Sequence, residues 1–224
     1  MAACVSVLNL KGGVGKTTIA AHVMRVLYHR HALKTLLVDL DPQFNLSQCL
    51  LTRKDYDHAI ANGKSVFFSM EPVATSSLFD VSTTQKPPPD PMSICSGLRR
   101  YADDSVFLHP IPGDYRLIKY SLVSDTAKLA SAKQRFLHFI NLAKKQYDLV
   151  VIDCNPSSSF ITMCALHACE HIIVPVRPDR YSILGLELVD KLLEEIPTIN
   201  PRPDRKSTRL NSSHSQQSRM PSSA

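Results

Sequence analysis

The sequence predicts an α/β fold in which a mostly parallel, twisted β-sheet is flanked by helices on both faces. Short apolar runs typical of buried strands alternate along the chain with longer segments whose apolar residues recur at helical spacing. A cluster of three glycines follows the first run, and two later runs end in aspartates. Alternating strands and helices favour a parallel sheet with right-handed crossovers, and ligands of such sheets bind at the carboxyl ends of the strands.

The predicted elements follow from these patterns in chain order. Strands are expected at residues 5–8, 35–40, 106–111, 149–152 and 171–176, and helices at residues 17–30, 126–145, 160–169 and 182–196. The run at 35–40 is apolar almost throughout, which suits a parallel strand buried on both faces. The stretch Lys86-Pro-Pro-Pro-Asp-Pro can form neither a helix nor a central strand. Residues 52–105 are therefore expected to be the least regular part of the chain.

Residues 9–18, between the first strand and the first helix, read Asn-Leu-Lys-Gly-Gly-Val-Gly-Lys-Thr-Thr. In a strand, glycine turn and helix in this order, the N–H groups of the turn and the helix N-terminus face anionic oxygens. Lys16 is expected to reach the β- and γ-phosphates of a nucleotide, and the Thr17 hydroxyl to bind Mg²⁺. The usual phosphate-binding loop (P-loop) has glycine where this chain has Leu10, and Lys11 adds a second lysine. The alternative is a glycine turn before an ordinary helix, with Lys11 as a solvated charge.

Aspartates stand where two of the predicted strands end. Asp39 and Asp41 close the second strand, and Asp153 follows the run Leu-Val-Val-Ile. One such aspartate is commonly a helix cap or a solvated loop residue, but two acidic strand ends beside the glycine loop indicate a site. Phosphoryl transfer needs positioning, a metal ion and positive charge. Asp153 is therefore expected to hold Mg²⁺ through coordinated water and Asp39 to serve the same metal, while Asp41 orients or activates the attacking water.

Four motifs, in order, resemble the ParA-type DNA partition ATPases of the ParA/MinD superfamily. Residues 11–18 are similar to the deviant Walker A loop of that family, and Asp39-Leu-Asp-Pro-Gln is similar to its switch I segment. Asp153-Cys-Asn-Pro-Ser resembles the Walker B and switch II stretch, and residues 174–182 resemble the segment after the next strand. The resemblance covers residues 1 to about 200. Asn155 departs from the proline common in switch II, which puts the flexibility of that segment in doubt.

The resemblance implies a role for each matching residue. ATP would be bound by Gly12, Gly13, Val14, Gly15, Lys16, Thr17 and Thr18, and Mg²⁺ by Thr17, Asp39 and Asp153. Lys11 would contact phosphates across a nucleotide-sandwich dimer, which makes Lys11, Lys16 and Asp41 the catalytic residues. Pro175 and Pro178 lie in the segment that approaches the adenine edge in relatives, although both could equally be ordinary loop prolines.

The function implied is that of a cytoplasmic, nucleoid-associated ATPase that partitions plasmids or chromosomes. Its partners would be a second copy bound in the presence of ATP, nonspecific DNA and a ParB-like centromere-binding protein. The basic residues Arg99, Arg100, Lys133, Arg135, Lys144 and Lys145 are candidate DNA contacts or simply solvated charges. A MinD-like membrane-positioning ATPase, which requires a basic amphipathic C-terminal helix, is the alternative, and the sequence Asp41-Pro-Gln after the second strand favours the partition branch. An iron–sulfur reductase is set aside, because Cys154 is the one cysteine in the switch motifs.

Composition is consistent with this assignment. A chain of 224 residues with 44% hydrophobic content can form one sizeable core. The six cysteines include no Cys-x-x-Cys pair, so they are expected to be free thiols, most of them buried, as is typical of a reducing compartment. No apolar run approaches the roughly 20 residues of a membrane span, and no stable membrane association is expected.

Residues 204–224 are expected to be a disordered tail outside the ATPase domain of residues 1–203. From Asp204 the sequence matches translated sequencing-adapter DNA, so the native C-terminus is expected to be missing and the domain incomplete. A natural basic, serine-rich tail is the alternative. The tail holds one acid, Asp204, and four basic residues, Arg205, Lys206, Arg209 and Arg219, so without it the formal net charge falls from +6 to +3. Basicity is therefore weak evidence for nucleic-acid binding.

Overall fold

A computed structural model describes residues 2–195, except positions 75, 76, 85, 101–104, 158 and 178. For residues 99, 100, 180–184 and 195 only the backbone is described. The predicted tail and Pro178 thus lie outside the described residues. The chain divides into two compact units, residues 1–190 and 191–224, and the fold below is that of the first, although its last helix runs on to residue 195.

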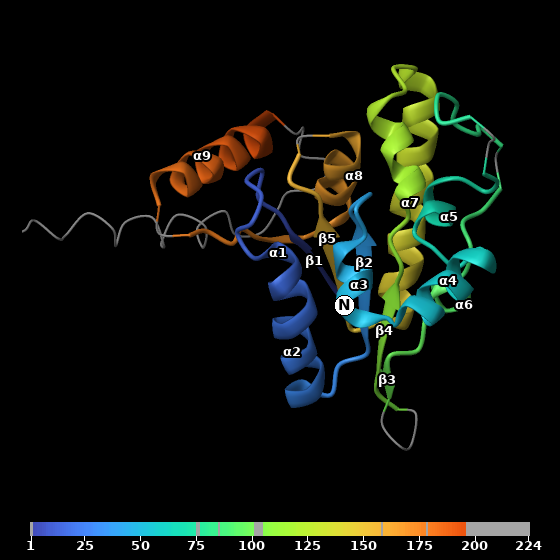
Figure 1. Ribbon diagram of the computed structural model, residues 1–224, viewed down its shortest axis with the longest axis horizontal. Helices are drawn as coiled ribbons and strands as arrows, with labels where there is room; N and C mark the ends of the chain where they lie inside the picture. The colour runs from blue at the N-terminus through green and yellow to red at the C-terminus, as the bar shows by residue number, and fades with distance from the viewer. Residues whose placement is uncertain are drawn as a thin grey trace, which may run out of the picture. The chain divides into compact units, whose positions relative to one another are not determined.

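The first unit is built on a six-stranded sheet (Figure 1). The strands are β1 (Ala3–Val7), β2 (Thr35–Leu40), β3 (Arg99–Arg100), β4 (Phe107–Ile111), β5 (Leu149–Cys154) and β6 (His171–Ile173), in the spatial order β3-β4-β2-β5-β1-β6. All neighbouring strands are parallel except the short β3, which runs antiparallel to β4. The predicted parallel α/β sheet is confirmed. Strand β6 is shorter than predicted, because ladder pairing with β1 ends at Ile173.

Helices connect these strands. They are α1 (Lys16–Thr18), the π-helical turn η1 (Ile19–Val23), α2 (Met24–His31), α3 (Asn45–Leu50), α4 (Arg53–Ala61), α5 (Phe67–Met70), α6 (Pro91–Ile94), the 3₁₀ segment η2 (Tyr115–Ser121), α7 (Thr126–Gln146), α8 (Phe160–Ala168) and α9 (Arg180–Glu195). The helix predicted at 17–30 is therefore interrupted by one turn of π-helix. Such turns occur as single bulges inside α-helices, often near functional sites.

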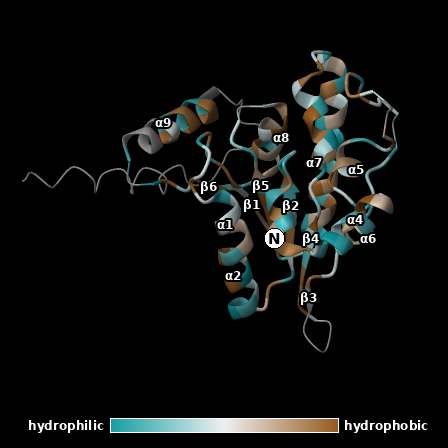
Figure 2. Cartoon of the chain, in the orientation of Figure 1, coloured by the Kyte–Doolittle hydropathy of each residue, from teal (hydrophilic) through white to brown (hydrophobic). Residues whose placement is uncertain are grey.

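The two faces of the sheet are covered by different helices (Figure 1). On one face, Met24 and Tyr28 of α2 belong to the same buried cluster as Val5 and Val151. On the other face, α7 and α8 pack on β5, and the Ser6 hydroxyl of β1 donates to a backbone carbonyl of α8 at 3.3 Å. Figure 2 shows both hydrophobic and hydrophilic residues on α2 and α7, as expected for helices with one buried face.

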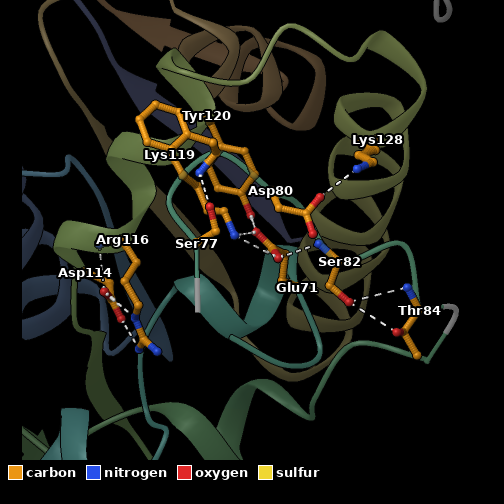
Figure 3. Close-up of polar contacts among 11 residues, drawn as sticks. Glu71, Ser77, Asp80, Ser82, Thr84, Asp114, Arg116, Lys119, Tyr120 and Lys128 are labelled. Carbon is orange, nitrogen blue, oxygen red and sulfur yellow. Dashed lines mark hydrogen bonds and ion pairs between the residues drawn. The ribbon is translucent and has the colours of Figure 1, made fainter. Parts of the chain in front are cut away.

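Residues 71–120, most of which lie in the region 52–105 predicted to be least regular, are held together by a buried charged group. The Glu71 carboxylate is fully buried and accepts from the Lys119 ammonium at 2.9 Å, the Tyr120 hydroxyl at 2.9 Å and the Ser82 N–H at 2.7 Å (Figure 3). These bonds fix the chain after α5 against η2, which begins shortly after β4.

None of the described helices has the length and hydropathy of a membrane span. All six cysteines are free, five of them buried, as the sequence predicted; Cys49 is exposed.

Candidate active site

The register of the sheet brings the predicted acidic residues to one edge. Val7, the last residue of β1, pairs with Asp153 of β5, and Asp153 pairs with Asp39 of β2. The glycine loop leaves β1 at the same level. The phosphate loop and both acidic strand ends therefore converge at the carboxyl edge of the sheet, where ligands of parallel sheets bind.

The glycine loop adopts the backbone conformation that its sequence requires. Gly13 and Gly15 have φ values of 71° and 93°, which side chains with a Cβ rarely adopt. Gly15 directly precedes α1. A Cβ added at either position would meet no atom within 4 Å, so the space beside both glycines is open. An open loop that leads into a helix N-terminus is a suitable cradle for phosphate oxygens.

Lys16, Thr17 and Asp153 meet below this loop. The Thr17 hydroxyl donates to Asp153 Oδ2 at 2.9 Å, while Asp153 Oδ1 is buried with no hydrogen-bond partner among the described residues. The Lys16 ammonium donates to the Lys11 carbonyl at 3.0 Å, and burial lowers its pKa against the opposing effect of Asp153 and Asp41. Burial raises the pKa of Asp153 to about 7, since the nearby Thr17 hydroxyl and Lys16 charge offset only part of the desolvation.

Asp39 is the most completely satisfied of the three acids. Its Oδ2 accepts from the Ser47 N–H at 2.8 Å and the Ser47 hydroxyl at 2.6 Å, and its Oδ1 accepts from the Asp41 N–H at 3.3 Å. Gly113 leaves no space beside it, because a Cβ there would lie 2.8 Å from Asp39 Cγ and from Phe44 Cβ. Burial raises the pKa of Asp39 to about 7. Asp39 thus fixes the segment that follows β2, from Asp41 to Ser47.

Asp41 lies within that segment and is almost buried, with 5% of its surface exposed. Its Oδ1 accepts from the Gln43 N–H at 2.9 Å, and its carbonyl accepts from the Phe44 N–H at 2.9 Å. Burial raises its pKa, opposed by the Gln43 hydrogen bond and by the positive charge of Lys16. The charges of Asp41 and Lys16 thus affect each other's pKa.

Lys11 does not point at open solvent. Its ammonium forms an ion pair with both carboxylate oxygens of Asp179, at 2.8 and 3.0 Å, and about a third of each side chain is exposed. Its backbone N–H donates to the buried Asn9 side chain at 2.9 Å, and the Asn9 amide donates to the Pro175 carbonyl at 2.8 Å. Asn9 and Asp179 thus tie the phosphate loop to the segment after β6.

The remaining predicted residues lie on the loop, on α1 and after β6. On the loop, Gly12 is exposed and Val14 is buried. Thr18 of α1 is exposed, and Pro175 is buried beside Asn9. Pro178 lies outside the described residues. Sequence reasoning missed Asn9, Ser47, Gly113 and Asp179. Asn9 and Asp179 stand inside the motifs themselves, but no local pattern distinguishes Ser47 or Gly113.

Comparison with known proteins agrees with this architecture. The sequence profile of the AAA domain family matches residues 2–206. The chain is 32% identical over 200 residues to the chromosome-partitioning ATPase Soj of Thermus thermophilus, covering 88% of this chain but 64% of Soj.

Two solved structures share the fold. The structure of pNOB8 ParA bound to nonspecific DNA has a TM-score of 0.66 at 22% identity, covering 91% of this chain and 62% of that one. Cobyrinic acid a,c-diamide synthase from Mycobacterium smegmatis with bound ADP and magnesium has a TM-score of 0.62 at 23% identity, covering 89% and 69%. The phosphate loop, the converging acids and the profile match lead to one assignment: the chain belongs to the AAA domain family.

Proposed function

We propose that this chain binds Mg²⁺–ATP at the carboxyl edge of its sheet and hydrolyses it as part of a partition ATPase that dimerises in the presence of ATP. One observation carries the proposal: Thr17 and Lys16 at the mouth of the glycine loop lie beside a buried Asp153 that has an unsatisfied oxygen. The relationship to Soj and the fold shared with ParA support the same activity.

The donor set fits magnesium. Mg²⁺ prefers oxygen ligands, usually one or two protein oxygens together with water and phosphate. Thr17 and Asp153 would hold the ion, and the free Oδ1 of Asp153 is the group that a cation or its water would satisfy. Asp39 would act one layer further out, since both its oxygens already accept hydrogen bonds from Ser47 and Asp41. When bound, the ion would neutralise charge on the transferred phosphate.

The other site residues would act directly on the nucleotide. The open glycine loop would donate its N–H groups to the phosphates, and Lys16 would add a buried positive charge beside them. Asp41 would orient the attacking water, because its almost buried carboxyl directly follows β2 at the carboxyl edge of the sheet. Pro175 and Pro178 would border the adenine.

Removal of the metal site tests this proposal. In the Asp153→Asn variant, ATP should still bind to the loop. The affinity for Mg²⁺ should fall by about 10- to 100-fold, the usual effect of removing a group that orients bound metal through water. Fluorescent ATP is titrated into the chain with Mg²⁺ and with EDTA, and Asp148→Asn at an exposed strand start serves as the control. Equal Mg²⁺ dependence in the Asp153→Asn variant would exclude Asp153 from the metal site.

The ion pair of Lys11 bears on the dimer. In a nucleotide sandwich, the Lys11 ammonium would leave Asp179 for a phosphate of the partner's nucleotide. A partly exposed ion pair is worth up to about 1 kcal/mol, so breaking the Lys11–Asp179 pair should cost the dimer little free energy. The lysine could then reach the phosphate.

Asp179→Asn should therefore raise the ATP-dependent dimer fraction about two- to fivefold at subsaturating ATP. Sedimentation velocity with and without ATP measures this fraction, and Asp179→Glu, which keeps the charge, should resemble the wild type. A lower dimer fraction in the asparagine variant would show that Asp179 supports the dimer instead. DNA and a ParB-like protein remain the proposed partners.

A further inference from the structure

Basic residues dominate the N-terminal part of this chain. The first acidic residue is Asp39, whereas the preceding 38 residues contain Lys11, Lys16, Arg25, Arg30 and Lys34. Lys11 and Lys16 belong to the active site. Arg25 and Arg30 do not, because they lie on the exposed side of α2, opposite the buried Met24 and Tyr28. The function proposed above gives these two arginines no role.

The exposed side of α2 forms one continuous surface. His22 of η1 and Arg25, Val26, His29 and Arg30 of α2, here called the α2 basic face, line a shallow depression of about 500 Å³ together with Tyr28. The spacing of these residues along the helix places them on one side over roughly 12 Å. No acidic residue lines the depression among the described residues.

Several other basic residues of the first unit pair with an acid. Arg53 binds Asp57, Arg116 binds Asp114, Lys128 binds Asp80 and Lys144 binds Glu170. Within the described part of the chain, no carboxylate lies within ion-pair distance of Arg25 or Arg30. Two exposed guanidinium groups with no acid nearby create a local positive potential.

We infer that the α2 basic face binds the sugar–phosphate backbone of duplex DNA. Arginine suits this ligand, because its planar guanidinium can donate two parallel hydrogen bonds to one phosphate. The contact carries no base readout, since phosphate contacts position a protein without reading sequence. The inference rests on the proposed partition function only for its choice of DNA as the polyanion.

Salt dependence tests this inference. Each phosphate neutralised contributes about 0.9 to the slope of log affinity against log salt. The double variant Arg25→Gln/Arg30→Gln should lower that slope by about 1.8 and weaken binding at low salt about tenfold or more. Fluorescence anisotropy of a labelled duplex, measured with ATP between about 50 and 200 mM salt, gives both values.

The matched control removes the same charge elsewhere. Lys54→Gln/Lys64→Gln changes two exposed lysines, one on α4 and one just after it, and should leave most of the slope intact. An unchanged slope in the arginine variant, or an equal loss in the lysine variant, would overturn the inference. The inference would also be overturned if the arginine variant lost binding to anionic phosphatidylserine vesicles but kept its binding to DNA.

ATP retention is measured on the same samples. If the wild type binds DNA but not ATP, the proposed ATPase function fails while the α2 result still stands. If ATP is retained and the arginine variant keeps its full salt slope, the inference about α2 fails alone.

Discussion

Replacing Lys11 with alanine should reduce ATP turnover on the order of 10³-fold, within the range that a positive group supplied across an interface contributes in related phosphoryl transfer. The loss is expected because the ammonium would stabilise charge that develops on the phosphate of the partner's nucleotide. ATP binding to the monomer should persist, since Lys16 and the open glycine loop remain. Steady-state phosphate release is measured beside fluorescent ATP binding.

Two controls separate this effect from general damage. Lys64→Ala removes an exposed lysine outside the site and should leave turnover unchanged. The Lys11→Ala melting transition should shift little, because the ion pair with Asp179 is partly exposed and worth up to about 1 kcal/mol. Turnover within twofold of the wild type would remove Lys11 from the catalytic set.

Replacing Glu71 with alanine should destabilise the chain by about 3–5 kcal/mol, the cost of breaking a buried ion pair by removing one partner. Glu71 is fully buried, Lys119 is 2% exposed, and their charged atoms lie 2.9 Å apart (Figure 3). The substitution would leave the Lys119 ammonium without its carboxylate and the Tyr120 hydroxyl and Ser82 N–H without their acceptor. Urea denaturation followed by circular dichroism measures the change.

A second ion pair in the same region provides the control. Asp80 binds Lys128 at 2.6 Å, but both side chains are at least a third exposed, so Asp80→Ala should cost at most about 1 kcal/mol. Replacing both Glu71 and Lys119 with methionine should recover much of the loss, since an apolar pair of similar size leaves no buried charge. A loss below about 1 kcal/mol for Glu71→Ala would contradict the account of this segment.

The regular part of the fold follows from local pattern. The strand at 35–40 is found with the predicted bounds, because a run that is buried on both faces has a distinctive composition. The interruption of the first helix by η1 was not predicted, since nothing in the spacing of its apolar residues distinguishes a π-turn from an α-turn. The Glu71–Lys119 pair spans 48 residues, and no local pattern shows which buried charges will meet.

The candidate site could likewise be predicted only in part. The glycine loop and the acidic strand ends could be placed together, because the topology of a parallel sheet brings strand ends to one edge. The partners of these residues could not. Gly113 is required by the space beside Asp39, and the Lys11–Asp179 pair joins positions 168 residues apart. Such contacts depend on how segments pack in three dimensions, which residue spacing does not encode.

Equilibrium titration of the chain with Mg²⁺–ATP is the decisive measurement for the proposed nucleotide site. Saturable binding of one nucleotide per chain is expected, weakened by EDTA and abolished by Lys16→Ala. Absence of binding by the wild type, or equal binding by the Lys16→Ala variant, would contradict it.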